Sequence, residues 1–209
     1  DKAQFNQWVR DYGDDSDFVR VRVRGLFPRA GTMQLIDGES VDDALRRVPE
    51  PDHRAPLVMG VDVARFGDDR SVIVLRRGRD VRSMPIEKHR GLDLMTLAGR
   101  VAEIAFGRDL AAIFVDETGL GAGVVDRLRQ LGVRHVQGVN FGSAAATWDS
   151  DGAKPRYANK RAEMWGNLRD WLNAGGALPD DPELRADLTG VEYGYTATGE
   201  IQLEKKEDM

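Results

Sequence analysis

Residues 57–75 read LVMGVDVARFGDDRSVIVL, and this stretch sets the interpretation of the rest of the chain. Two apolar, β-branched runs flank the polar cluster at 67–69, which predicts strands over 57–64 and 71–77 joined by a tight turn. Asp62 interrupts the first run. A carboxylate among apolar residues is costly to bury without compensation, and a metal cation is a common compensator. The same pattern also fits an Asp at a strand end that caps a loop amide.

A second acid stands in a similar place in residues 110–123, LAAIFVDETGLGAG. The apolar run predicts a strand buried on both faces, and Asp116 closes it before a glycine-rich turn and a helix. If the strands of Asp62 and Asp116 lie side by side, both carboxylates point at one position, where oxygen ligands select Mg²⁺ or Mn²⁺. The glycines at 119–123 either cradle a phosphate at a helix N-terminus or allow close strand–helix packing, and we favour packing.

Composition narrows the class of protein. The 209 residues are 41% hydrophobic and 31% charged, which suits one globular domain with a sizeable core. The absence of Cys excludes disulfides, thiolate metal sites and a cysteine nucleophile, and it fits a reducing cytoplasm. The net charge of −5 argues against a basic nucleic-acid coat, but not against a nuclease, whose metal site is itself acidic. No apolar run reaches membrane-spanning length, and no Walker-type phosphate loop is present.

Hydrophobic periodicity predicts the remaining elements. A strand at 80–87 follows the first two with short connections, which gives an antiparallel meander. Alternating helices and strands come next, so the expected fold is α/β, an RNase H-like mixed sheet of three antiparallel strands then parallel strands, flanked by helices. The other expected elements are helices at 1–12, 41–47 (capped by Ser40), 92–106, 121–131, 157–172 and 182–189, strands at 17–26, 110–116 and 133–139, and a hairpin of 191–196 and 200–203.

Basic residues gather beside the Gly- and Ser-rich segment 141–155. Lys160 and Arg161 stand near the start of a predicted helix, where positive charge is unfavourable for the helix dipole, and this favours an external anion such as DNA phosphate. A solvated basic face accounts for the pattern equally well. The candidates for phosphate contact are Lys154, Arg156, Lys160, Arg161, Lys205 and Lys206.

The two acidic stretches carry a family resemblance. Gly60–Ala64 with the turn at 67–69, followed by Val115–Gly121, resemble the nuclease domain of the bacteriophage terminase large subunit, and the similarity extends to segments 15–28, 160–165 and 203–209. The resemblance implies that Asp62 and Asp116 are the catalytic metal ligands of an endonuclease with two Mg²⁺ or Mn²⁺ ions, and that Asp68 is an auxiliary ligand. It implies cleavage of double-stranded DNA concatemers during genome packaging.

The resemblance also implies a domain organisation and partners. Residues 1–56 would be a linker following an ATPase domain, and residues 57–209 the nuclease domain. The expected partners are double-stranded DNA, that ATPase domain, the small terminase subunit and the portal, without a membrane, in the cytoplasm of the bacterial host. The family carries a third acid on a helix beyond the Lys-Lys segment, and the sequence ends at Met209 before it, so we expect weaker metal binding and poorer DNA cleavage than in a longer chain.

Two other classes of function remain open from the sequence. One is an ASKHA-type phosphate- or ATP-binding domain, in which residues 67–71 form a phosphate turn. The other is a non-catalytic assembly module that docks to a portal or to a motor ATPase.

Overall fold

The computed structural model describes residues 2–12, 19, 24, 33–64, 69–147 and 156–204. The chain forms two compact units. The sheet unit comprises Asp42–Gly142 and Trp171–Asp181, and the hairpin unit comprises Asp1–Val41, Ser143–Asp170 and Pro182–Met209.

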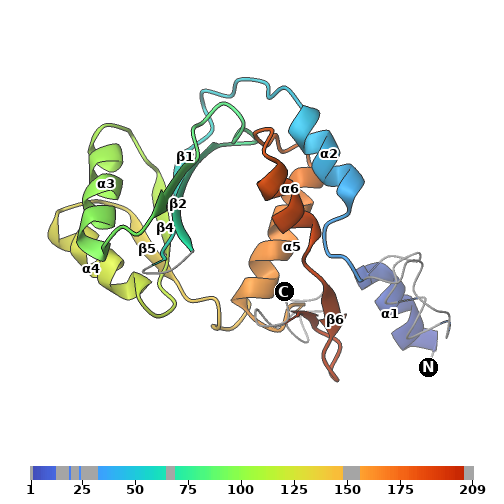
Figure 1. Cartoon of the computed structure of the whole chain (residues 1–209). Coiled ribbons are helices and arrows are strands. Elements are labelled where there is room, and N and C mark those ends of the chain that lie inside the picture. Colours follow the sequence, from blue (N-terminus) through green and yellow to red (C-terminus); the bar gives the residue numbers. More distant parts are fainter. Residues whose placement is uncertain are drawn as a thin grey trace. The chain divides into compact units, whose positions relative to one another are not determined.

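A five-stranded mixed sheet in the order β3-β2-β1-β4-β5 forms the centre of the sheet unit (Figure 1). The central strand β1 pairs antiparallel with β2 and parallel with β4. β3 extends the antiparallel side and β5 extends the parallel side. The strands are β1 (Leu57–Asp62), β2 (Arg70–Arg77), β3 (Glu87–Arg90), β4 (Ala112–Asp116) and β5 (Val136–Val139).

Two helices, α3 (Leu94–Phe106) and α4 (Gly121–Gln130), cover one face of this sheet (Figure 1). Side chains alternate along each strand, so every second residue of β1, β2 and β4 turns toward these helices. The buried core between sheet and helices consists mainly of Leu57, Met59, Val61, Ile73, Leu75, Leu97, Ala98, Val101, Ile113, Val115, Val124, Val125 and Leu128. The predicted fold, a mixed sheet with flanking helices, is confirmed.

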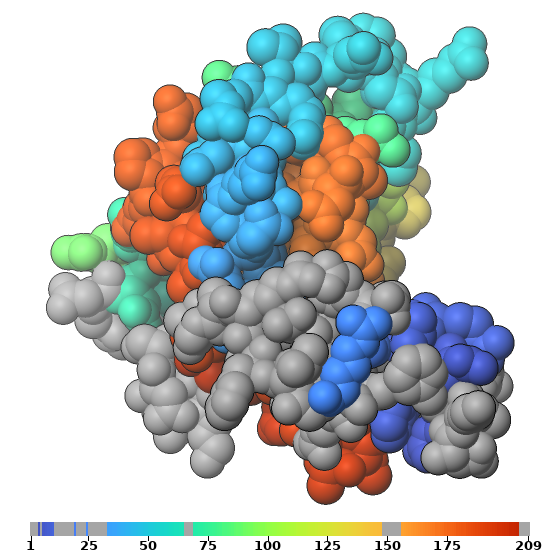
Figure 2. Space-filling view, turned by 90° about the vertical axis from the view of Figure 1, so that its right-hand side faces the viewer, coloured from blue at the N-terminus to red at the C-terminus, as the bar shows by residue number. Residues whose placement is uncertain are grey.

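Residues 171–181 complete the sheet unit and lie against the C-terminal part of α2 (Gly38–Arg46), as the light blue and orange atoms of Figure 2 show. The Leu178 amide donates to the Ala44 carbonyl at 3.0 Å. The Arg47 guanidinium donates to the Gly176 carbonyl at 2.6 Å. The first bond satisfies the carbonyl of Ala44, which lies in the last turn of α2 and has no partner within that helix. The second joins the residue directly after α2 to the turn that follows α5 (Lys160–Asn173).

The strand expected at 80–87 is wrong, because β3 begins only at Glu87. Asp80 accepts a hydrogen bond from the Ser83 amide at 2.9 Å and so stabilises a turn. The Val81 amide donates to the Ala177 carbonyl at 3.1 Å, a long-range bond that replaces pairing with β2. Pro85 has no amide hydrogen to contribute to a ladder.

The start of α2 also differs from the expected one. The helix begins at Gly38, and the Asp37 carboxylate accepts bonds from the Ser40 amide and hydroxyl, both at 2.8 Å. Asp37 is therefore the cap, and Ser40 already lies in the first turn.

The expected strand at 17–26 lies outside the described residues, apart from Val19 and Arg24.

The hairpin unit is built around α5 and a short two-stranded sheet, as the hairpin prediction expects. The Leu35 amide donates to the Val191 carbonyl at 2.9 Å, which joins the N-terminal segment to the hairpin. Buried Tyr157 packs where a side chain on Gly166 of α5 would overlap its ring. The elements are α1 (Lys2–Tyr12), the N-terminal part of α2, α5 (Lys160–Asn173, mostly in this unit), α6 (Pro182–Thr189), β6 (Tyr193–Tyr195) and β7 (Ile201–Leu203).

No helix among the described residues has both the length and the apolar character needed to cross a membrane.

Candidate active site

Asp62 and Asp116 end two neighbouring parallel strands in the same register. Val61 of β1 pairs with Val115 of β4, so the residue that follows each of them comes next in the same row across the sheet. Neighbouring strands are about 4.8 Å apart, and residues in one row of a parallel pair project from the same face. Val61 and Val115 are buried against α3 and α4, so the two aspartates project from the opposite face.

The position of Asp116 is fixed by the turn that follows it. The Thr118 amide donates to Asp116 Oδ1 at 2.9 Å, and Gly119 adopts a φ of 68°, which favours glycine. A Cβ on Gly121 would overlap the carbonyl oxygen of Asp116, so α4 begins directly against the end of β4. Close packing, the role favoured for these glycines from sequence, is confirmed at Gly121. The Thr118 bond uses one carboxylate oxygen, and a carboxylate has further acceptor sites on its second oxygen.

The end of β1 is held by a buried hydroxyl. Ser71 of β2 is 1% exposed, and its Oγ donates to the Ala64 carbonyl and accepts from the Ala64 amide, both at 3.0 Å. Asp62 itself pairs with Val72 in the antiparallel ladder. The backbone on both sides of Asp62 is therefore constrained by β2.

The sheet beside the two aspartates has little side-chain cover. Gly60 and Phe114 pair with each other two residues before Asp62 and Asp116 and project from the same face. A Cβ on Gly60 would have no atom within 4 Å, and Phe114 is 38% exposed although its neighbours on β4 are buried. An exposed phenylalanine and an uncovered glycine thus lie next to the carboxylate pair.

Glu117 turns away from this face. Its carboxylate lies where a Cβ on Gly138 would be, and Gly138 is the register partner of buried Val115. Alternation along a strand puts Glu117 on the face opposite Asp116, and the structure agrees. Among the described residues, no group of three or more acidic or histidine side chains is arranged to hold a metal ion. The described site is therefore a carboxylate pair.

Only some of the other predicted site residues lie in the part of the chain that the structure describes. Asp68, Lys154, Lys205 and Lys206 lie outside the described residues. Arg156 is part-buried, with its Cζ 5.6 Å from the ring centroid of Tyr157. Its buried Nε has no hydrogen-bond partner among the residues that the structure describes.

Lys160 and Arg161 have partners inside the hairpin unit. Lys160 forms an ion pair with Glu163, and Arg161 donates to the Glu204 carbonyl at 2.8 Å. DNA contact by the six predicted basic residues stays a prediction.

Glu163 is a structural residue that sequence reasoning missed. Its side chain is buried, and Oε1 accepts from the Ala146 amide at 3.0 Å, the Thr147 amide at 2.7 Å and the Thr147 hydroxyl at 2.6 Å. Burial raises the pKa of Glu163, but these bonds and the Lys160 ammonium outweigh burial, so the pKa lies below its usual value. Its i, i+3 spacing from Lys160 is the only signal in the sequence, because the loop amides lie far away along the chain.

Comparison with known proteins rests on structure alone. No protein-family model matches the sequence. No curated protein sequence matches it either.

Several solved structures share the architecture. The nuclease domain of the large terminase subunit gp2 of bacterial virus Sf6 aligns with a TM-score of 0.65 at 21% identity, over 85% of this chain and 90% of that chain. The fold is RNase H-like. The large terminase nuclease from thermophilic phage G20c aligns with a TM-score of 0.54 at 17% identity, over 84% of this chain and 89% of that chain. The nuclease domain from Thermus phage P74-26 aligns with a TM-score of 0.53 at 16% identity, over 81% and 85%.

Some of these structures contain divalent metals. The Sf6 domain has been solved with manganese as a K428A mutant, and the G20c nuclease with magnesium and with cobalt. The resemblance to terminase nuclease domains is thus confirmed at the level of the fold.

Proposed function

We propose that this chain is the metal-dependent nuclease domain of a phage large terminase subunit and that it hydrolyses phosphodiester bonds of double-stranded DNA. The observation that carries the proposal is the parallel register of β1 and β4, which aligns Asp62 with Asp116 on one face of the sheet. The shared fold supports the same conclusion, because the similar solved structures are terminase nuclease domains that hold manganese, magnesium or cobalt.

The carboxylate pair fits a divalent metal. Two carboxylates on adjacent strands repel each other unless a cation lies between them, and hard oxygen ligands favour Mg²⁺ or Mn²⁺. Two such ions bound there would activate a water molecule and stabilise the leaving oxygen of the cleaved bond. Asp62 and Asp116 would hold the ions, with Asp68 as an auxiliary ligand.

Neighbouring residues of the chain hold the two carboxylates in position. The Thr118 amide orients the Asp116 carboxylate, and the Ser71 hydroxyl holds the backbone that follows Asp62. The exposed surface of Gly60 and Phe114 leaves room for a substrate beside the pair. Fixed ligands of this kind reduce the reorganisation that metal and substrate binding would otherwise require.

We propose the biological setting by the same analogy. The domain would act with the ATPase domain of the same protein, the small terminase subunit and the portal, and would cut DNA concatemers in the cytoplasm of the bacterial host.

Plasmid cleavage in Mn²⁺ tests the proposed function. Wild-type protein should convert supercoiled plasmid to nicked and linear forms, and Asp62→Asn or Asp116→Asn should lower the rate at least ~100-fold, because each removes a metal ligand. Asp109→Asn is the matched control: it removes one exposed carboxylate of the sheet unit that lies outside the pair, and it should leave the rate unchanged.

Two outcomes would contradict the proposal. Wild-type protein that binds Mn²⁺ without cutting DNA would favour the non-catalytic assembly module. Cleavage that survives both Asp62→Asn and Asp116→Asn would place the chemistry elsewhere.

A further inference from the structure

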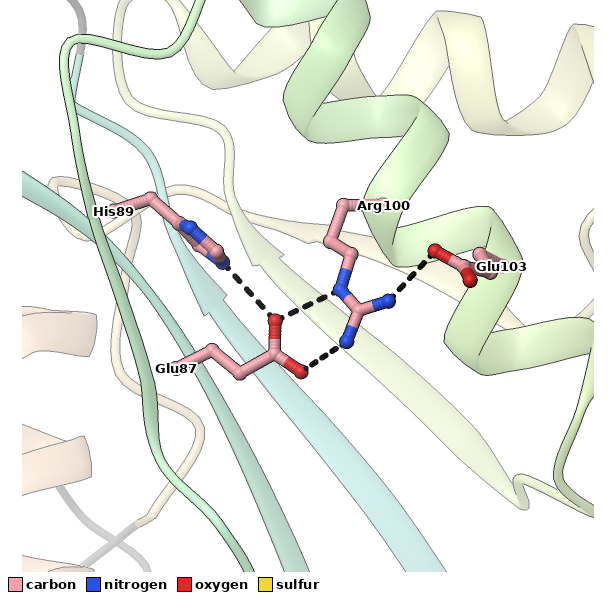
Figure 3. A network of polar contacts seen from close by, with 4 residues as sticks. All are labelled: Glu87, His89, Arg100 and Glu103. Carbon is pink, nitrogen blue, oxygen red and sulfur yellow. Dashed lines mark hydrogen bonds and ion pairs between the residues drawn. The ribbon is translucent and has the colours of Figure 1, made fainter.

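The edge strand β3 has two chemically different faces. Glu87 and His89 project toward α3, where Arg100 donates to both Glu87 oxygens at 2.9 and 2.7 Å (Figure 3). His89 Nε2 lies 3.0 Å from Glu87 Oε2, and Arg100 also pairs with Glu103 at 2.6 Å. The Arg100 hydrogen bonds lower the pKa of Glu87 to about 2, and the pKa of Arg100 is raised. This network fixes which face of β3 is turned toward α3.

The alternate residues of β3 therefore project from the other face. Lys88 and Arg90 are exposed. Lys88 pairs with Val72, which in turn pairs with Asp62, so one row across the sheet joins the cationic edge to the carboxylate pair. Two residues further along, in the next row on the same face, Arg90 pairs directly with Arg70 of β2.

Two arginines thus share the face of Asp62 and Asp116. With strands about 4.8 Å apart and about 3.3 Å per residue, the Cα of Arg70 lies about 8 Å from that of Asp62, and the Cα of Arg90 about 12 Å. Three or four phosphates of one strand pass along about 12 Å of duplex. Both guanidinium groups are therefore within reach of phosphates that neighbour one held at the carboxylates.

The other charges on this side of the sheet delimit the surface. Lys88 forms an ion pair with Asp181 at 2.7 Å, so part of its charge is balanced within the sheet unit. Exposed Asp69 precedes Arg70 in the chain. Arg76, at the other end of β2, donates to the Gly78 carbonyl at 2.7 Å. We call Arg70 and Arg90, which pair with each other across β2 and β3 on this face, the arginine strip.

We propose that the arginine strip binds the phosphate backbone of the DNA duplex that is cut at Asp62 and Asp116. The proposal rests on the proposed function and adds a DNA-contacting surface to it. Guanidinium groups bind phosphate oxygens in a bidentate manner, which orients the duplex as well as attracting it. Because such contacts read no base edges, the strip positions DNA without sequence preference.

The salt dependence of DNA binding tests the strip. An Asp62→Asn/Asp116→Asn background removes the carboxylate charge and any metal bound to it, so binding is measured apart from cleavage. In this background we compare Arg70→Gln/Arg90→Gln with Arg70→Lys/Arg90→Lys, using the anisotropy of a fluorescent duplex across a KCl series. Each lost phosphate contact makes the slope of log K against log salt concentration shallower by about 0.9, so the Gln pair should lose about 1.8 and the Lys pair little.

Arg108→Gln/Arg134→Gln is the matched control, because it removes two exposed positive charges of the same unit that precede β4 and β5, whereas Asp62 and Asp116 end their strands. Its slope should equal that of the background. An equal change in both Gln pairs, or none in the strip pair, would overturn the proposal. If the strip pair alone changes while wild-type protein fails to cut plasmid in Mn²⁺, the strip is supported and the nuclease proposal fails. If wild-type protein cuts plasmid and the strip pair keeps its slope, only the strip fails.

Discussion

The two faces of the five-stranded sheet use the same strands for different purposes. On the face covered by α3 and α4, alternate residues such as Met59 and Ile113 are fully buried. On the opposite face, the intervening residues are Gly60 and Phe114, followed by Asp62 and Asp116. The first face supplies burial energy, and the second presents charge and open surface. The difference suggests that stability and chemistry can be changed separately in this unit.

Adjacent residues of β4 offer the largest expected contrast. Ile113→Ala removes a fully buried side chain and leaves a cavity, so it should lower the free energy of unfolding by about 2–5 kcal/mol. Phe114→Ala, one residue further on, removes a side chain already 38% exposed and should cost about 1 kcal/mol. Urea unfolding measures both. Equal losses for the two variants would contradict the division between the faces.

A smaller loss of stability is expected at the start of α4, where the helix packs directly against the end of the strand that carries Asp116. Gly121→Ala places a Cβ onto the Asp116 carbonyl, so the strand end or the helix must shift, at a cost of about 1–3 kcal/mol. Plasmid cleavage should fall as well, because Asp116 moves with its backbone.

Gly123→Ala, in the same helix, is the control. Its Cβ would meet only Leu94 Cδ1 at an ordinary 3.8 Å, so the variant should be as stable as wild type or up to about 1 kcal/mol more stable. If Gly121→Ala behaves like Gly123→Ala, the contact with Asp116 does not constrain the site.

Gly60→Val should change the free energy of unfolding by less than Gly121→Ala does and still lower the rate of DNA cleavage. The Cβ of the new side chain meets no atom within 4 Å, and replacing a strand glycine should raise the free energy of unfolding by roughly 0.5–1 kcal/mol. Cleavage should nevertheless fall, because the side chain occupies the surface beside Asp62. Gly99→Ala in α3, also open around its Cβ, should be stabilised by a similar amount and keep full cleavage. Full cleavage by Gly60→Val would mean that DNA does not use this surface.

The smallest effect is a loss of the stability contributed by Glu87 as the solution becomes acidic. Its folded-state pKa of about 2 lies below the ordinary 4.5, so its ionised form adds stability above about pH 4.5. That contribution is lost as the pH falls from about 4.5 toward 2. The stability gap between wild type and Glu87→Gln should therefore narrow across this window, as measured by urea unfolding at a series of pH values. A gap that stays constant with pH would show that ionisation of Glu87 is not coupled to folding.

The sequence allowed both the fold and the carboxylate pair to be predicted, for a local reason. Each acid directly follows an apolar strand run, and parallel pairing brings such strand ends together. The cationic face of β3 escaped prediction, because Glu87, Lys88, His89 and Arg90 are all polar and no apolar residue marks the inner face. The register with β2, in which Glu87 pairs with buried Ile73, and the contact between Glu87 and Arg100 of α3 fix it.

Long-range contacts explain the other differences between the structure and what the sequence predicts. The expected strand at 80–87 was displaced by hydrogen bonds from Val81 and Arg82 to Ala177, which no local pattern announces. Glu163 binds amides 16 and 17 residues earlier in the chain, and its helical neighbours predict only an exposed pair with Lys160.

The proposed function requires that Asp62 and Asp116 share divalent ions on the face of the sheet opposite α3 and α4. Anomalous diffraction from crystals of the chain soaked in Mn²⁺ tests it most directly. We expect two peaks about 3.5–4 Å apart, each next to an oxygen of Asp62 or Asp116. Mn²⁺ bound elsewhere with no peak at this pair, or the two carboxylates on opposite faces of the sheet, would contradict it.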